Sequence, residues 1–200
     1  MDIAEKISKT CAKFVSKNLE ITEDELEKIE YGAQVIFVNL VKLIILFLIA
    51  SILRVANYTC IAIISFASIR IFASGIHADS NIKCTITNIL LFLGNVYFSM
   101  NIVLNKYMNI TILALSLLLV ILYAPADTED RPLLSKRLRK KLKIYSITIT
   151  LFMGAMAIKC ESDVFSNLII FSVLEASLLI TPISYYIFNK RYRNYENINL

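Results

Sequence analysis

Glycine, proline and histidine are scarce in this chain, and their scarcity limits the kinds of protein it can be. Only 4 glycines and 3 prolines occur among 200 residues, which disfavours long irregular segments. There is a single histidine, and none of the 4 cysteines belongs to a C-x-x-C pair, so no zinc-binding pattern is present. We therefore expect neither a metal nor a cofactor.

Three further features are missing. The N-terminal region 1–30 is charged throughout and lacks the apolar core of a secretory signal. No basic stripe is interleaved with aromatic side chains, so we expect no nucleic-acid partner. The apolar runs are continuous and do not alternate with polar residues, which argues against a transmembrane barrel.

What the chain has in abundance is apolar sequence. Hydrophobic residues make up 57% of it and its mean hydropathy is +0.64, values typical of integral membrane proteins. Helical spans need roughly 20 apolar residues to cross a bilayer. We predict a single all-α membrane domain, 1–200, with a six-span bundle at 33–188 and a tail at 189–200. The predicted spans are 33–53, 58–74, 88–104, 108–124, 144–158 and 165–188.

Two helices are expected before the first span, within residues 1–30. In residues 2–19, apolar side chains recur on one face and lysines on the other, at helical spacing. Such an amphipathic helix lies flat among lipid headgroups or packs on the spans of its own chain, and the sequence favours neither. Residues 22–25 have the pattern of a capping box, which starts a second, acidic helix that leads into the first span.

The distribution of lysine and arginine predicts the orientation. The predicted loop 125–143 is strongly basic, whereas the segments on the opposite side carry only Arg54, Lys106 and Lys159. By the positive-inside rule, the basic loop, both termini and the segment between the second and third spans face the cytoplasm. We therefore expect a multi-pass protein of a cell membrane, in contact with lipids on its outer faces.

The segment 70–84, between the second and third spans, contains the candidate chemistry. It holds His77, the only histidine, and Cys84, and together a thiol and an imidazole can form a nucleophile with its general base. A continuous helix would hold them about 10 Å apart, so catalysis requires a turn, for which Gly75 and 79–81 are signals. A helix beginning near Cys84 would favour its thiolate. The alternative is an interfacial histidine and an inert cysteine.

The pattern Arg70, Gly75, His77 and Cys84 resembles that of the accessory gene regulator B family, bacterial membrane peptidases that process quorum-sensing pro-peptides. The resemblance covers nearly the whole chain, including the segment after the fourth span. Family members often carry two glycines before the histidine, where this chain has Ser74 first. The resemblance implies that His77 is the general base, that Cys84 is the nucleophile, and that Arg70 and Gly75 support them. On residues alone, Arg70 fits a positive-inside anchor equally well.

The function implied by this resemblance is that of a cysteine endopeptidase in the bacterial cell membrane. It would release the C-terminal part of an AgrD-like pro-peptide and leave an acyl-thioester on Cys84. A cysteine or serine inside the peptide would then attack this thioester and close the thiolactone or lactone ring of an autoinducing peptide. The resemblance also implies a homodimer.

Other charged residues leave alternatives open. Lys42 and Glu175 lie mid-way in the first and last predicted spans, where they form a mutual pair or a polar site for substrate. The basic segment anchors the chain at the headgroups, or binds the acidic tail of the pro-peptide. Its residues are Lys136, Arg137, Arg139, Lys140, Lys141 and Lys143. The rival functions are a small peptide transporter that uses the intramembrane charges and a non-catalytic scaffold that presents the basic segment.

Overall fold

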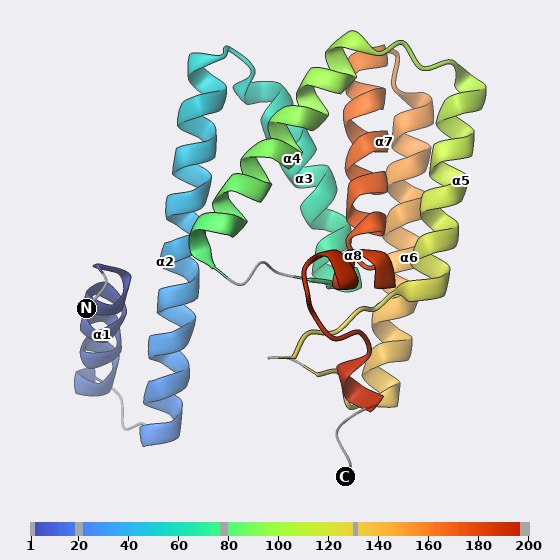
Figure 1. The fold of residues 1–200 in the computed structure, drawn as a ribbon. Coiled ribbons are helices and arrows are strands. Elements are labelled where there is room, and N and C mark those ends of the chain that lie inside the picture. Colours follow the sequence, from blue (N-terminus) through green and yellow to red (C-terminus); the bar gives the residue numbers. More distant parts are fainter. Residues whose placement is uncertain (1–2, 19–21, 77–79, 130–131, 197–200) are drawn as a thin grey trace. The chain divides into compact units, whose positions relative to one another are not determined.

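The computed structural model describes residues 3–18, 22–76, 80–129 and 132–196 (Figure 1). In these ranges the regular elements are helices, and the only β-type pairing is one isolated bridge. The all-α prediction is therefore confirmed. The chain divides into two compact units, Met1–Leu53 and Arg54–Leu200, each of which is described by itself.

The first unit consists of α1 (Ile3–Asn18) and α2 (Glu23–Ile52). The predicted capping box is present: the Thr22 hydroxyl accepts from the Glu25 amide, and the Glu25 carboxylate accepts from the Thr22 amide at 2.9 Å. The acidic helix and the first span are therefore one continuous helix of 30 residues.

The N-terminal helix α1 contacts α2, which favours packing on its own span. The buried side chains of α1 include Ser8 and Ala12, whereas Phe14 of the predicted apolar face is 72% exposed. This helix therefore packs through small residues, and Phe14 is exposed at the depth where an amphipathic helix meets lipid.

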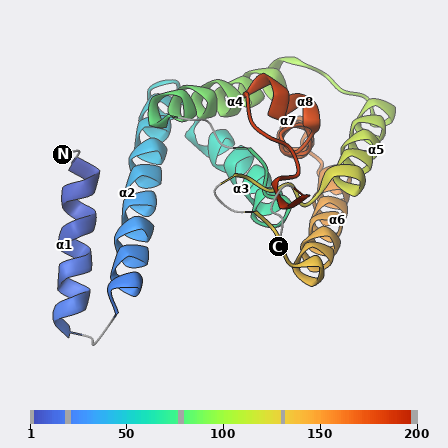
Figure 2. The same ribbon diagram turned by 60° about the horizontal axis from the view of Figure 1, so that its bottom comes forward.

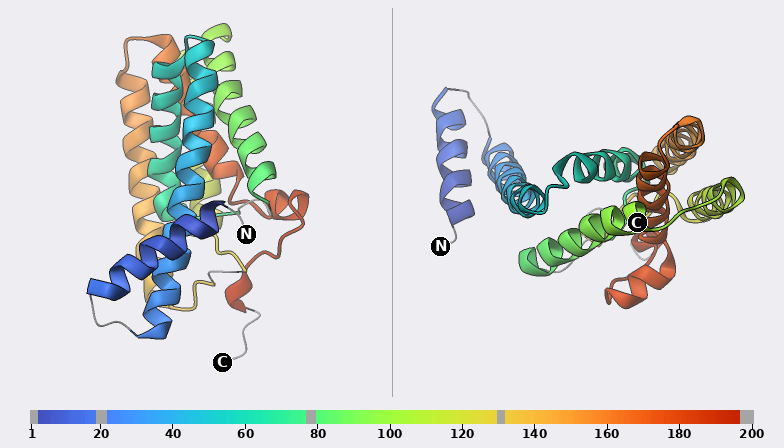
Figure 3. Two further views of the ribbon diagram at one scale, coloured as in Figure 1. Left: turned by 90° about the vertical axis from the view of Figure 1, so that its left-hand side faces the viewer. Right: turned by 90° about the horizontal axis from the view of Figure 1, so that it is seen from above.

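The second unit has six α-helices and a short 3-10 helix in its described part. They are α3 (Ala56–Ala73), α4 (Asn81–Asn101), α5 (Lys106–Tyr123), α6 (Lys136–Lys159), α7 (Asp163–Leu178), α8 (Pro182–Ile187) and η1 (Asn194–Glu196). Helix α7 contacts α3, α4, α5 and α6, and the view from above shows it among them (Figure 3).

Five helices, α2 to α6, are long and apolar enough to cross a membrane, and they correspond to the first five predicted spans. The sixth span was wrong as a continuous helix to residue 188, because α7 ends at Leu178 and α8 begins at Pro182. Proline lacks an amide hydrogen and disfavours helix before it, so Thr181 caps a new helix there. The 16-residue α7 is covered mainly by other helices.

Two helices begin well before the predicted spans. Helix α4 starts at Asn81 and not at 88, and α6 starts at Lys136 and not at 144. The side chains of Ser80 and Ser135 accept hydrogen bonds from the third helical residues and so cap the two helices. Since lysine, arginine and leucine favour helix, the basic segment predicted as loop extends α6 instead.

Candidate active site

The backbone that leaves α3 adopts an unusual conformation. Helix α3 ends at Ala73, and both following residues have positive φ, 56° at Ser74 and 115° at Gly75. Residues other than glycine rarely adopt a positive φ. The predicted turn at Gly75 is therefore present. Ser74 occupies a backbone position at which glycine is also favoured.

Arg70 and Gly75 meet in this turn. Nη2 of Arg70 donates to the carbonyl of Ile76 at 2.7 Å, and its guanidinium lies 5.7 Å from the centre of the Phe66 ring. A Cβ on Gly75 would overlap Nη1 of Arg70 and lie 3.0 Å from the Leu179 carbonyl oxygen. Only glycine leaves room for the guanidinium, so the structure places these two sequence-predicted residues in direct contact.

The segment after α5 holds this turn from the other side. The amide of Ala126 donates to the carbonyl of Ala73 at 2.9 Å, and Ala126 forms a parallel bridge with Ser74. The next residue, Asp127, is 3% exposed, and its carboxylate accepts the amides of Asn194 and Tyr195. Sequence reasoning noted this segment only for its resemblance to the family, and missed that it connects the C-terminal residues to the turn (Figure 2).

The Tyr185 side chain strengthens the same connection. It is 1% exposed, and its hydroxyl donates to the carbonyl of Asp127. Because Tyr185 belongs to α8, the break between α7 and α8 brings a buried tyrosine beneath the segment that supports the turn. The signal in the sequence was Thr181-Pro182, which marks a helix boundary within the sixth predicted span.

Cys84 lies in the first turn of α4, as the prediction of a helix near it required. Its amide donates to the Ser80 carbonyl at 2.9 Å, and its partly exposed Sγ lies 3.9 Å from Nδ2 of Asn88. The Arg70 guanidinium is near enough to interact with Cys84 electrostatically. His77 lies outside the described residues, which stop at Ile76 and resume at Ser80, so its pairing with Cys84 stays a prediction.

The other cysteines occupy different environments. Cys60 is near the start of α3 and Cys160 follows the end of α6, so both lie at the end of the bundle away from Cys84 (Figure 1). The side chain of Cys11 lies outside the description. Over the parts of the chain that the structure describes, no group of three or more potential metal ligands occurs.

Glu175 belongs to a polar network inside the bundle. Nδ2 of Asn95, on α4, donates to the Glu175 carboxylate at 3.1 Å and to the Ser172 hydroxyl at 3.0 Å. Ser172 in turn donates to the carbonyl of Ala62 on α3. No pattern in the sequence singles out Asn95. Lys42 lies on α2 in the other unit, so its pairing with Glu175 stays a prediction.

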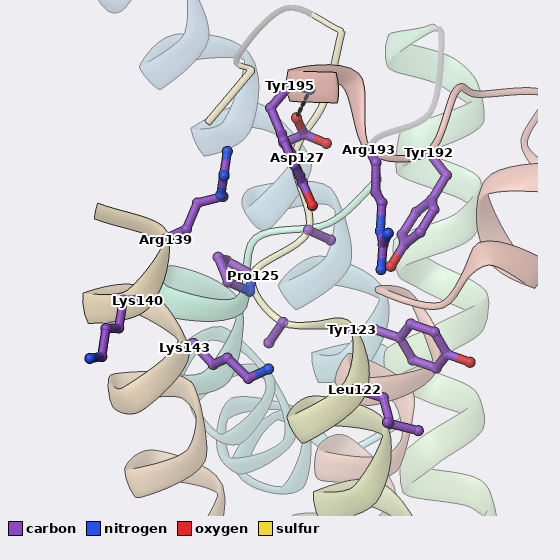
Figure 4. Close-up of a pocket in the computed structure, with 12 residues that line it drawn as sticks. Leu122, Tyr123, Pro125, Asp127, Arg139, Lys140, Lys143, Tyr192, Arg193 and Tyr195 are labelled. Atoms are coloured by element: carbon purple, nitrogen blue, oxygen red, sulfur yellow. Dashed lines mark hydrogen bonds between the residues drawn. The ribbon is translucent and has the colours of Figure 1, made fainter. Parts of the chain in front are cut away.

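The basic segment, now the first two turns of α6, divides into two groups. Lys136, Arg137, Lys140 and Lys141 are exposed, whereas Arg139 and Lys143 are partly buried. The latter pair helps to line a pocket of about 280 Å³ together with the end of α5 and the C-terminal segment (Figure 4).

The bundle of apolar helices defines an integral membrane protein, with a thiol in the first turn of one span and a guanidinium-held turn at the end of another. The chain belongs to the accessory gene regulator B family, whose model matches residues 8–181. Membership implies a role in quorum-sensing peptide processing.

The matches to curated relatives cover most of this chain and most of each relative. A putative AgrB-like protein of Clostridium acetobutylicum is 32% identical over 96% of this chain and 92% of its own. Another from Listeria innocua is 31% identical over 87% of this chain and 85% of its own. Accessory gene regulator protein B of Staphylococcus epidermidis is 31% identical over 92% and 93%. No solved structure matches this chain.

Proposed function

We propose that the protein is a membrane-embedded cysteine endopeptidase that cleaves a quorum-sensing pro-peptide and promotes its cyclisation. The observation that carries the proposal is the setting of Cys84. Its thiol is partly exposed in the first turn of α4, within electrostatic range of the guanidinium that also holds the carbonyl immediately before His77. A partly exposed thiol seven residues after the single histidine of the chain is the pairing that a cysteine nucleophile with its own general base requires.

The chemistry would proceed in two acyl transfers. The imidazole of His77 takes the proton of Cys84, and the thiolate attacks a peptide carbonyl of the substrate. The amide bond breaks, the leaving amine takes a proton, and the C-terminal fragment departs from an acyl-thioester. A cysteine or serine within the bound peptide then attacks the thioester carbonyl, which closes the ring and returns the proton and the free thiol to the enzyme. Exclusion of water favours ring closure over hydrolysis.

The test is cleavage of a candidate pro-peptide, with an amphipathic leader, a cysteine or serine and an acidic tail, by purified protein in proteoliposomes. Cys84→Ser should abolish cleavage, while the Cys60→Ser/Cys160→Ser variant should retain it. Mass spectrometry should find the acyl group on Cys84 alone. Transport or partner binding without any cleavage by the parent protein would favour the transporter or scaffold instead, and an acyl group on another cysteine would refute the mechanism.

The exposed basic residues of α6 are proposed to bind the acidic tail of the pro-peptide. All four of these residues are exposed: Lys136, Arg137 and Lys141 do not line the pocket, and Lys140 lies at its rim. Exposed charges attract an acidic segment in a salt-dependent way. Reversing their charge should raise the apparent KM, and the effect should fade at high salt. Unchanged cleavage after neutralisation of all four would leave them only an anchoring role.

Orientation and assembly are also proposed. The positive-inside rule favours both termini and residues 75–87 in the cytoplasm. Cysteines introduced at Asn81 and Asn105 should then label from opposite sides of intact cells, and labelling of both from outside would refute this topology. We further propose a homodimer, because self-association can bury intramembrane polar residues such as Lys42. A monomer mass in nanodiscs at working concentration would contradict it.

A further inference from the structure

The pocket beside α6 carries an excess of positive charge. Its lining includes Arg139, Lys143 and Arg193, with Lys140 at the rim. In Figure 4, Lys143 extends toward the middle of the pocket while Lys140 points away from it. The lining carboxylate, Asp127, is already bonded through both oxygens to backbone amides. A concave site with this charge is suited to an anion.

The cations differ in how far they are already engaged. Arg139 donates to the Leu133 carbonyl at 2.7 Å and lies 3.8 Å from the centre of the Tyr195 ring. Arg193 forms an exposed ion pair with Glu196 at 3.2 Å. No interaction is found for Lys143 with any residue that the structure describes, which leaves its ammonium available to a ligand.

The position of the pocket indicates a ligand at headgroup depth. Tyr123 is the last residue of α5, and Lys143 stands where the apolar part of α6 begins. Tyrosine and lysine at the ends of spans mark the interface between hydrocarbon and water. The volume of about 280 Å³ lies near the lower end of the roughly 300–1,000 Å³ of sites for drug-sized ligands, which gives room for a headgroup.

An apolar stripe leads away from the pocket along α5. Leu122 lines the pocket and is 54% exposed, and Leu118 and Leu115 continue the same helical face at 51% and 48% exposure. Acyl chains could lie along this stripe while their headgroup occupies the pocket. A soluble phosphate or an acidic peptide would leave the stripe unused.

We propose that the pocket binds the phosphate of an anionic phospholipid, with Lys143 and Arg193 as its charged contacts and the acyl chains along Leu115, Leu118 and Leu122. The inference is independent of the proposed peptidase activity. A lipid bound in the pocket would be coupled to the candidate site, because the segment 124–127 that lines the pocket is also hydrogen-bonded to the end of α3.

The test is native mass spectrometry of the full chain released from nanodiscs of phosphatidylcholine with added phosphatidylglycerol. The parent should retain phosphatidylglycerol over phosphatidylcholine. Lys143→Gln should weaken this retention about fivefold, the effect of one cation near an anionic surface. Lys143→Arg should restore it. Lys159→Gln is the matched control, since it removes an exposed lysine at the opposite end of the same helix and should change nothing.

Each other outcome overturns the proposal. Equal retention by Lys143→Gln and Lys159→Gln would show that the lipid binds by general surface charge. Displacement of the lipid by inorganic phosphate at equal concentration would identify a site for a soluble anion. Displacement by a short Glu-rich peptide would assign the pocket to an acidic polypeptide. Circular dichroism of each variant would confirm that its helices are intact before binding is compared.

Discussion

The turn after α3 and the first turn of α4 belong to one candidate site, yet the packing around them differs greatly. At Gly75 the backbone has positive φ and a guanidinium fills the place of a side chain. At Cys84 the helix is regular, and the side chain is partly exposed with one weak sulfur contact. Close packing therefore restricts which residue can occupy position 75, whereas at position 84 only the proposed reaction requires a cysteine. Substitutions should separate the two.

Gly75→Ala should have the largest effect on stability. Its Cβ would strain the backbone and displace Arg70 from the Ile76 carbonyl, so we expect a loss of about 3 kcal/mol and of cleavage. Thermal unfolding in detergent measures the first and the proteoliposome assay the second. Gly94→Ala is the control: a Cβ there meets nothing within 4 Å, so stability should stay within about 1 kcal/mol of the parent. Equal behaviour of the two variants would remove the distinction drawn above.

The Gly75→Ala/Arg70→Met double variant should be more stable than the sum of its single changes predicts. Much of the cost at Gly75 arises from overlap with Nη1 of Arg70, so removing the guanidinium should recover roughly half of the lost stability. Backbone strain and the contact with the Leu179 carbonyl would account for the remainder. Strict additivity of the two changes would show that the overlap does not set the cost.

Arg70→Met alone should affect cleavage far more than stability. The lost hydrogen bond to Ile76 should destabilise the protein by about 1.5–3 kcal/mol. The change also removes Nη1, a buried donor without a partner in the described structure, and so relieves a penalty of about 1–3 kcal/mol. The two nearly cancel, so we expect a net change of about 1 kcal/mol. Parallel unfolding and cleavage measurements test this, and a large loss of stability with normal cleavage would identify Arg70 as a purely structural residue.

Ser74→Gly should stabilise the protein slightly. Its φ of 56° and ψ of −138° suit glycine, so relief of strain should outweigh the added freedom of the unfolded chain by about 0.5–1 kcal/mol. The midpoint of thermal unfolding should rise. Unchanged cleavage would show that the serine hydroxyl has no role in the reaction, and a lower midpoint would contradict the strain inferred here.

Cys84→Ser should have the smallest effect on stability, within about 0.5 kcal/mol, because the side chain is partly exposed and little packed. Cleavage should nevertheless be lost. Unfolding and cleavage assays on the same preparation would show this contrast directly. A variant as unstable as Gly75→Ala would mean that the first turn of α4 is constrained by packing as well.

Hydropathy located the helices that face lipid and misjudged the one that faces protein. Helix α2 has many large apolar side chains that are exposed, and its extent as a span was predicted closely. Helix α7 buries small and polar residues such as Asn167, Ser172 and Ala176 against its neighbours. In a membrane, close helix packing selects small residues, and apolarity alone does not report it. The prediction therefore passed over the end of α7.

Composition and local pattern were enough to predict the membrane class, the capping of α2, the candidate residues and the likeness to a peptide-processing family. These depend on composition, local spacing and short motifs, which need no knowledge of distant contacts. Three contacts became visible only in the folded chain: Arg70 fills the space beside Gly75, Ala126 pairs with the turn, and Asp127 accepts hydrogen bonds from the C-terminal residues. These contacts join segments up to 68 residues apart, and the sequence pattern of one segment carries no signal for the shape of another.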